Sequence, residues 1–350
     1  MLNWSSRLHL SSWVCEPAKP ASRGVSCLLT FKHLRIGRFQ NTQAVSRNGS
    51  CRRPWPALSQ RQIAWLCRRW PLLTLFFFFS GGCRGLYTKS TGFCRLKSSV
   101  SFLTRPDRPN LAYHKLKGRN PGIIFLPGLN SNMNGQKAIA LEDFCNSLGH
   151  AFIRFDYTGC GSSNGNIEEC TIGKWRKDVL SILDELTDGP QILVGSSLGG
   201  WLMLHAAMAR PDKVAALVGV AIAADHLVTT FNRLPIEAQK EIEEKGEWKL
   251  PTKHSEEGYY SLTYDFIREA ENHCVLNSPI PVTCPIRLIH GMKDDDVPWQ
   301  ISMQVADRVL SKDVDIILRK VGQHRMSEME DTKLLVNTID DLIDKLTTLA

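Results

Sequence analysis

Short apolar runs recur along residues 98–350, and a segment with helical spacing follows most of them. The first run, residues 122–126, is continuously apolar rather than alternating with polar residues, which is typical of a strand buried on both faces. The runs lie at residues 122–126, 151–155, 191–194, 214–221, 286–289 and 314–318. Strands that alternate with helices in this way predict an α/β fold with a mostly parallel central sheet and helices on both faces. The active sites of such sheets lie beyond the carboxyl ends of the strands.

The segments between the runs carry apolar residues three or four positions apart, as amphipathic helices do. The clearest are Ala140, Phe144, Cys145 and Leu148, before a capping Gly149; Trp175, Val179, Leu183 and Leu186; a helix that ends near Ala209; and Leu335, Ile339, Leu342 and Leu346. Before the first run, residues 98–104 and 111–117 predict a short antiparallel pair of strands.

Residues 1–95 differ from the rest of the chain in charge. The first 100 residues carry sixteen Lys and Arg and one acid, Glu16, whereas the remaining 250 carry 27 basic and 34 acidic residues. The body is therefore mildly acidic, which argues against nucleic-acid binding. An Arg-rich, Ser-rich and acid-poor segment is typical of a mitochondrial transit sequence. We therefore predict a leader over residues 1–95, one domain over residues 96–350 and a location in mitochondria, in the matrix.

One apolar block competes with this interpretation of the leader. Residues 72–79 end in four phenylalanines, Phe76 to Phe79. The block is shorter than the roughly 20 apolar residues that cross a bilayer, so no stable membrane span is expected. The alternative is the apolar core of an internal signal anchor.

The cysteines argue against a disulfide framework. Five of the eleven lie in the body, at positions 145, 160, 170, 274 and 284, and no two of these form a CxxC pair. An odd number without that spacing also argues against a structural zinc site. Free thiols suit a reducing compartment such as the cytosol or the mitochondrial matrix.

The sequence Gly195-Ser196-Ser197-Leu198-Gly199 fits the G-x-S-x-G pattern of the nucleophile elbow in α/β hydrolases. That turn holds a serine at the end of a strand, and its glycines avoid clashes with neighbouring backbone. The pattern is common by chance, but here a buried run precedes it and helical spacing follows it. Ser197 is therefore the candidate nucleophile.

A serine nucleophile needs a base, and the base needs an acid that orients it. In α/β hydrolases the acid precedes the histidine in the chain. Residues 290–298, HGMKDDDVP, follow a buried run, and the H-G-x-x-D-x-x-V-P spacing selects Asp294 as the acid. Asp296 is expected to bond the turn and Asp295 to face water.

His324 is the candidate base because it lies in the loop between the last run and the last helix. His205 within a helix is expected to pack and His290 before the acid to play a structural role, whereas His226, His254 and His273 lie in a segment that we interpret as a lid. Acyl transfer also needs N–H donors for the oxyanion. We predict the backbone N–H of Leu198 and that of Leu129, in the loop after the first parallel strand.

Residues 225–283 separate two strands by far more than the usual connection of about 2–6 residues, which predicts an active-site lid. Trp201, Phe231 and Trp248 are candidates to contact a substrate. The aromatic residues of the insertion, Phe231 and Trp248 included, either line an acyl channel or pack a small core of the lid itself. Asp225, at the start of the insertion, is expected to cap a helix or act as a hinge.

The body from about residue 98 resembles the mitochondrial palmitoyl-protein thioesterases of the abhydrolase-domain series, also known as acyl-glucuronide esterases. Its most specific stretches are residues 154–157, 171–181, 194–206 and 290–299. Matching the motifs of that family selects Ser197, Asp294 and His324 again. Residues 1–95 do not resemble the usual leader of the family.

The resemblance implies a serine hydrolase that cleaves S-acylated proteins, small acyl esters and acyl glucuronides through an acyl-enzyme. Such a mechanism calls for no metal and no organic cofactor. Two alternatives remain: a broad-specificity carboxylesterase or lipase, and an inactive hydrolase-fold binding protein.

Overall fold

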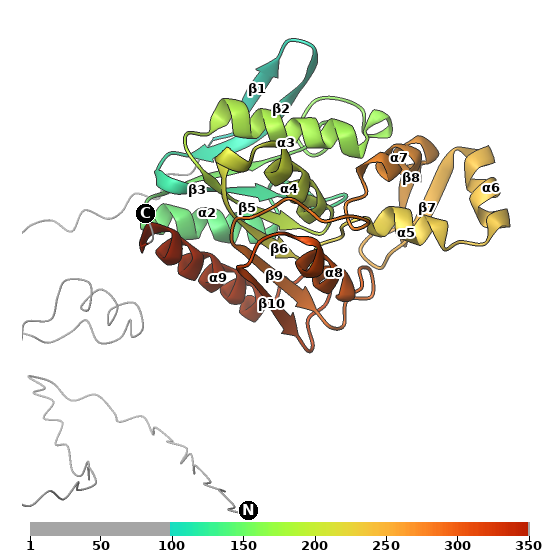
Figure 1. The fold of residues 1–350 in the computed structure, drawn as a ribbon. Helices are drawn as coiled ribbons and strands as arrows, with labels where there is room; N and C mark the ends of the chain where they lie inside the picture. Colours follow the sequence, from blue (N-terminus) through green and yellow to red (C-terminus); the bar gives the residue numbers. More distant parts are fainter. Residues whose placement is uncertain (1–98, 349–350) are drawn as a thin grey trace, which may run out of the picture. The chain divides into compact units, whose positions relative to one another are not determined.

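The computed structural model describes residues 99–348, whose centre is a single eight-stranded sheet (Figure 1). The strands lie in the order β1-β2-β4-β3-β5-β6-β9-β10. Strand β2 is antiparallel to β1 and β4, and all other neighbours are parallel. The strands are β1 (Ser101–Arg105), β2 (Arg108–Leu116), β3 (Arg119–Leu126), β4 (His150–Phe155), β5 (Gln191–Ser196), β6 (Val214–Val220), β9 (Ile286–Gly291) and β10 (Val314–Arg319).

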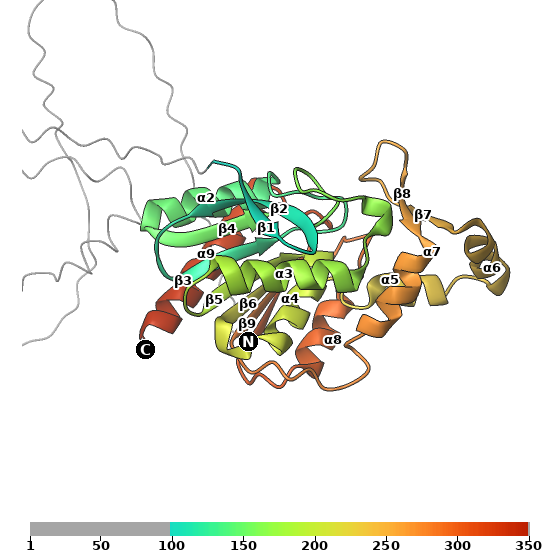
Figure 2. The same cartoon turned by 90° about the horizontal axis from the view of Figure 1, so that it is seen from above.

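Helices cover both faces of this sheet, as Figure 2 shows from above. One face packs under α3 (Ile172–Leu186), α4 (Leu198–Ala209) and α8 (Gln300–Arg308), and the other under α2 (Gln136–Leu148) and α9 (Met329–Thr348). Short 3-10 turns lie at Ile167–Glu169, Pro211–Lys213 and Glu271–His273. The predicted α/β-hydrolase architecture is confirmed. Most of the apolar runs became buried strands because only a sheet covered on both sides removes such a run from water. The last run forms the edge strand β10, whose side chains are at most partly buried.

The buried face of α2 differs from the prediction. The helix ends at Gly149, which has a left-handed φ of 74° as expected of a C-cap. However, Ala138, Leu141 and Cys145 face the core, while Ala140, Phe144 and Leu148 are only partly buried. The helix is therefore rotated relative to the prediction, because apolar residues lie around much of it and spacing alone does not choose among them.

The segment between β6 and β9 forms a separate substructure next to the sheet. It comprises α5 (His226–Asn232), α6 (Ile236–Lys245), the antiparallel pair β7 (Glu247–Pro251) and β8 (Tyr259–Thr263), and α7 (Tyr264–Ala270). Figure 1 places these elements together at one end of the sheet. The sequence did not predict the β7–β8 hairpin.

Asp225 ties the two ends of this segment together. Its side chain makes no capping bond to α5, so the predicted helix cap is wrong. Instead, the buried carboxylate accepts the backbone N–H groups of Val275 at 2.9 Å and of Leu276 at 2.7 Å, fifty residues further along the chain. These bonds join the start of the segment to its end.

The proposed leader, including residues 72–79, lies outside the described residues. Within residues 99–348, no helix is both long and apolar enough to cross a membrane. The five cysteines of this part have free thiols, as predicted.

Candidate active site

Ser197 occupies the turn between β5 and α4 in a backbone conformation that few side chains adopt. Its φ is 54° and its ψ is −120°, which costs on the order of 1–3 kcal/mol for a residue other than glycine. The surrounding packing holds it there: the N–H of Ser197 donates to the carbonyl of Val220 at 2.9 Å. A side chain on Gly199 would overlap the backbone oxygen of Leu126, which explains the glycine two residues after the serine.

Ser197, His324 and Asp294 form one hydrogen-bonded chain. Nε2 of His324 lies 3.1 Å from Oγ of Ser197, and Nδ1 of His324 lies 2.8 Å from Oδ2 of Asp294. The serine follows β5, the acid follows β9 and the histidine follows β10. These strands are parallel, so the loops after them lie at the same edge of the sheet. The sheet thus brings together residues that are up to 127 positions apart.

All acceptor positions of Asp294 are occupied. Oδ1 accepts the backbone N–H groups of Asp296 at 3.0 Å and Val297 at 2.8 Å, and Oδ2 lies 3.1 Å from Nε2 of His290. Burial by itself would raise the pKa of this carboxyl group. The hydrogen bonds from His290 and His324 outweigh burial, and they hold the pKa of Asp294 well below its usual range. Asp294 therefore stays ionised beside the imidazole of His324.

The two neighbouring aspartates differ from Asp294 in their surroundings. The side chain of Asp295 is 74% exposed and pairs with Lys253 at 2.8 Å. Asp296 accepts a hydrogen bond from Oγ1 of Thr252 at 3.1 Å and lies 2.9 Å from Nε2 of His254. The prediction that Asp295 faces water is confirmed. Asp296 bonds its own turn through its backbone N–H, which donates to Asp294, while its side chain contacts the β7–β8 loop instead.

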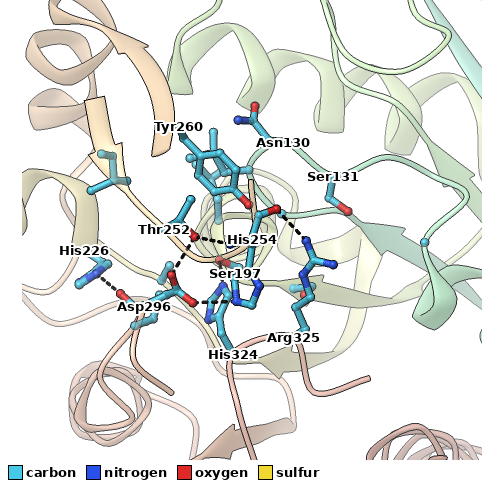
Figure 3. Close-up of a pocket in the computed structure, with 18 of the residues that line it drawn as sticks. Asn130, Ser131, Ser197, His226, Thr252, His254, Tyr260, Asp296, His324 and Arg325 are labelled. Carbon is cyan, nitrogen blue, oxygen red and sulfur yellow. Dashed lines mark hydrogen bonds and ion pairs between the residues drawn. The ribbon is translucent and has the colours of Figure 1, made fainter. Parts of the chain in front are cut away.

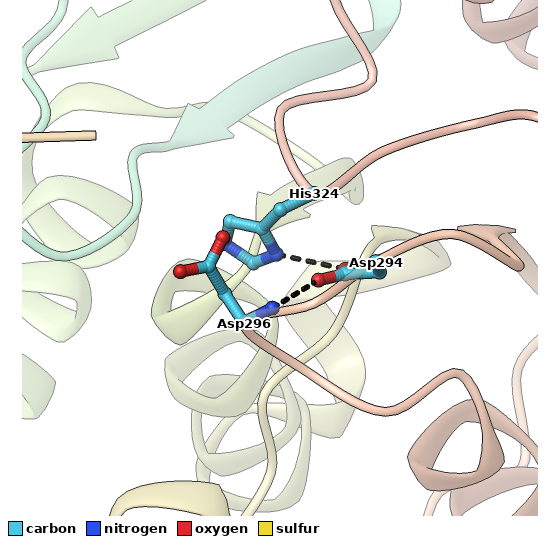
Figure 4. A group of neighbouring side chains, drawn as sticks. All are labelled: Asp294, Asp296 and His324. Carbon is cyan, nitrogen blue, oxygen red and sulfur yellow. Dashed lines mark hydrogen bonds and ion pairs between the residues drawn. The ribbon is translucent and has the colours of Figure 1, made fainter. Parts of the chain in front are cut away.

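Asp294, Asp296 and His324 also form the one group in the described part of the chain that has metal-ligand spacing (Figure 4). Their ligand atoms lie within 4.8 Å of one another. A carboxylate has about four acceptor positions, and those of Asp294 are filled by protein donors. We therefore interpret this group as a hydrogen-bonded acid–base pair and not as a metal site.

Ser197 opens onto a cavity of about 760 Å³ (Figure 3). Leu227, Leu250, Tyr260 and Val297 contribute to its lining. Figure 3 shows His226 and Asp296 on one side of Ser197 and Ser131 and Arg325 on the other. Thr252 and His254, from the β7–β8 loop, lie next to the candidate triad, and the rings of His254 and His324 are stacked with centroids 6.0 Å apart.

The candidate oxyanion donors both border this cavity. Leu198 begins α4 immediately after Ser197, and Leu129 lies in the loop after β3. A Cβ atom on Gly128 would lie only 3.8 Å from Oγ of Ser197, so this loop passes close to the nucleophile. Two residues of the 154–157 stretch hold the loop in place. Oδ1 of Asp156 accepts the N–H of Met133 at 2.7 Å, and the hydroxyl of Tyr157 donates to the carbonyl of Pro127 at 3.1 Å.

The three predicted substrate-binding aromatics do not line the cavity. Trp201 is fully buried and donates from Nε1 to the carbonyl of His273 at 3.0 Å. Phe231 and Trp248 are about 5% exposed and pack edge-to-face against each other, with ring centroids 5.7 Å apart. They form the core of the inserted segment, which was the alternative interpretation for Phe231 and Trp248. The sequence analysis missed Leu227, Leu250, Thr252, His254 and Arg325, because no local pattern marks a residue that lines a cavity.

Comparisons with known proteins agree with this geometry. The α/β hydrolase fold family matches residues 121–251. A protein of Homo sapiens named palmitoyl-protein thioesterase ABHD10, mitochondrial, is 72% identical over 256 residues, which cover 73% of this chain and 84% of that protein. The chain belongs to the ABHD10 family of α/β hydrolases. The Bos taurus protein of the same name is 65% identical over 294 residues, which cover 82% of this chain and 96% of that protein.

A solved structure supports the same assignment. The alpha/beta hydrolase domain-containing protein 10 from mouse is 69% identical, with a TM-score of 0.69. The match covers 71% of this chain and all of that chain. The predicted resemblance is therefore confirmed, and the chain is a hydrolase. The relatives' names also confirm the prediction of a mitochondrial protein, while the matrix stays a prediction.

His205 provides a pH test of how the inserted segment is held. Its Nε2 lies 2.9 Å from the carbonyl of His273, the same oxygen that Trp201 reaches, and burial lowers the pKa of His205 to about 4. An unfolded histidine has a pKa of about 6.5. The neutral form is favoured in the folded protein, so this contribution to stability is complete above about pH 6.5 and is lost as the pH falls toward 4.

We expect His205 to account for about 2 kcal/mol of the fall in unfolding free energy between pH 7 and pH 5. Urea unfolding of residues 96–350 at both pH values measures this fall for the natural protein and for His205→Gln, whose amide retains an N–H donor. The variant should lose less stability than the natural protein. Equal losses in the two proteins would contradict the assignment to His205.

Proposed function

We propose that this chain is a serine thioesterase that removes long acyl chains from protein cysteines. The observation that carries the proposal is the hydrogen-bonded chain of Ser197, His324 and Asp294 at a cavity of about 760 Å³. The names of the ABHD10 relatives support the palmitoyl-protein substrate. They do not favour a carboxylesterase, a lipase or an inactive binding protein.

In the proposed reaction, His324 removes the proton of Ser197 while the serine attacks the thioester carbonyl. The backbone N–H groups of Leu198 and Leu129 donate hydrogen bonds to the carbonyl oxygen, on which negative charge develops. Asp294 keeps Nδ1 of His324 protonated and stabilises the imidazolium. The cysteine sulfur takes the proton from His324 and leaves as a thiol. Water then attacks the acyl-enzyme with His324 again as base, which releases the fatty acid and restores Ser197.

The apolar part of the cavity supports a fatty acyl chain. Leu129, Leu227, Leu250 and Val297 border it, and Leu227 and Leu250 come from the inserted segment. We propose that residues 225–283 act as a lid that covers the bound chain. Contacts from Thr252 and His254 to Asp296 hold the β7–β8 loop of this lid beside the candidate acid.

Acyl chain length tests this proposal. Burial of one methylene group is worth about 0.8 kcal/mol, or roughly a fourfold change in kcat/KM. We expect kcat/KM for S-acyl peptides to rise by up to about fourfold per methylene, from acetyl toward longer chains, until the chain fills the cavity. The dependence of kcat/KM on chain length is measured by the release of free thiol from peptides that share one sequence and differ in their acyl group. A flat or falling series would contradict the acyl channel.

The domain boundaries and two further reactions stay predictions. Residues 1–95 are proposed as a mitochondrial leader and residues 96–350 as the hydrolase domain. Hydrolysis of acyl glucuronides and of other small acyl esters follows only from the resemblance. Neither reaction is named for the relatives compared above.

A further inference from the structure

One end of the cavity carries two cationic side chains that no carboxylate of the described residues contacts directly. Lys137, in the first turn of α2, and Arg325, next to His324, both line the cavity. The ammonium group of Lys137 donates to the backbone carbonyl of Arg325. The guanidinium group of Arg325 donates to the backbone carbonyl of His254 at 3.2 Å. Within residues 99–348, neither cation pairs with a carboxylate.

The acidic residues that line the cavity are engaged elsewhere. Asp295 pairs with Lys253, and Asp296 contacts Thr252 and His254. Figure 3 shows Asp296 and Arg325 on opposite sides of Ser197. Burial and the nearby charge of Arg325 lower the pKa of Lys137 to about 8, although the carboxylate of Asp331 acts in the opposite direction. An anion bound between Lys137 and Arg325 would stabilise the charged form of Lys137 and so offset both the burial and the repulsion between the two cations.

The start of α2 adds to this positive potential. Gly135 precedes the helix and provides no capping side chain, and the first turn carries no acid. Gly135 and Gln136 also line the cavity. The N-terminus of a thirteen-residue helix presents free N–H groups and a partial positive charge, which favour anions. Two side-chain cations and a helix terminus therefore lie along one wall of the cavity.

The position of Arg325 indicates that the cationic wall of the cavity lies near the leaving group of the substrate. In the proposed mechanism His324 gives its proton to the leaving group, so the departing atom must lie next to Nε2 of His324. Arg325 directly follows His324, whereas the apolar residues Leu227 and Leu250 come from the lid. The acyl chain thus has an apolar region of its own, and the leaving group meets the cations.

We propose that Lys137 and Arg325 form an anion-binding subsite that selects leaving groups with a carboxylate or a phosphate near the scissile bond. This inference rests on the proposed function, because it uses the same nucleophile and the same departing atom. For a protein substrate, such an anion is a carboxylate close to the acylated cysteine. For a small thioester, it is a carboxylate or a phosphate on the thiol. Arginine suits both because its guanidinium group binds two oxygens at once.

Matched substrate pairs test the subsite with an octanoyl chain held constant. The carboxylate pair is S-octanoyl-N-acetylcysteine and its amide, which differ in charge but hardly in shape. The phosphate pair is S-octanoyl-4′-phosphopantetheine and S-octanoyl-pantetheine. We expect kcat/KM to favour the anionic member of at least one pair by about tenfold or more, the value of a charge-assisted hydrogen bond. The pair that responds identifies the source of the anion.

Three variants assign the preference to its residues. Lys137→Gln and Arg325→Gln keep a side-chain N–H donor for the carbonyls that the cations bond, but they remove the charge. Each should lower the anionic-to-neutral ratio, and the double variant should bring it close to one. Lys253→Gln is the matched control, because it removes a charge from the lid loop that Arg325 contacts but lies outside the cavity lining, so its ratio should stay unchanged.

The ratio of kcat/KM between the anionic and the neutral substrate distinguishes anion binding by the two cations from a purely structural role. If the cations only hold the loops together, the variants lower kcat/KM for both members of a pair equally, and the proposal is overturned. Equal rates for both members of both pairs in the natural protein overturn it as well. If the natural protein cleaves neither the charged nor the neutral thioesters, the proposed thioesterase function fails, which is a different result from hydrolysis without a charge preference.

Discussion

Replacement of Ser197 by alanine is expected to lower kcat for S-acyl peptides by about 10⁶-fold. The hydroxyl of Ser197 lies 3.1 Å from Nε2 of His324, in a turn whose φ of 54° holds it at the cavity floor. Without this oxygen no acyl-enzyme forms, and His324 has no nucleophile to activate. Thiol release at saturating substrate measures the loss, and labelling with a fluorophosphonate probe reports the nucleophile directly.

Ser196→Ala is the matched control for this experiment because it changes the neighbouring serine of the same motif. Ser196 is the last residue of β5 and forms none of the triad hydrogen bonds. We expect Ser196→Ala to be labelled by the probe and Ser197→Ala not to be. Circular dichroism checks that both variants are folded. Labelling of Ser197→Ala at the natural rate would disprove the assignment of the nucleophile.

The second large effect is expected for Asp294→Asn, which should lower kcat by about 10⁴-fold. An amide group has only one acceptor oxygen, whereas Asp294 accepts bonds from Asp296, Val297, His290 and His324 with two oxygens. The variant therefore cannot satisfy all four donors, and it loses the charge that stabilises the imidazolium of His324. The kcat for one S-acyl peptide, measured for each aspartate variant in turn, tests the assignment.

Asp295→Asn is the control, because Asp295 is exposed and pairs with Lys253 at the surface. It should change kcat by no more than a few-fold. A loss for Asp295→Asn as large as that for Asp294→Asn would mean that the motif spacing selected the wrong acid. Retention of a tenth or more of kcat by folded Asp294→Asn would also contradict the proposed triad.

The same variant should be less stable at neutral pH. The pKa of Asp294 is below its usual value in the folded protein, so its contribution to stability is present above about pH 4 and is lost as the pH falls further. Urea unfolding at pH 7 should show Asp294→Asn destabilised by about 1–3 kcal/mol, the cost of leaving a buried hydrogen-bonding group unpaired. The activity comparison is therefore made well below the unfolding midpoint of the variant.

The sequence by itself determined the strands of the central sheet, most of the helices around it and the residues that carry the proposed chemistry. Short apolar-rich runs such as residues 191–194, each followed by helical spacing, indicate strands covered on both faces, and G-x-S-x-G describes a local turn. The acid and the base were found for the same reason. Each lies at a fixed place after a strand, and parallel strands bring such places to one edge of the sheet.

The tertiary structure decided which side chains line the cavity. Trp201, Phe231 and Trp248 were expected near a substrate, but apolar burial has no direction, so their sequence could not distinguish a core from a channel. Asp296 bonds Thr252 across 44 residues of chain, and Arg325 reaches His254 across 71. Contacts of this range depend on how the inserted segment packs against the sheet, and no local pattern records them.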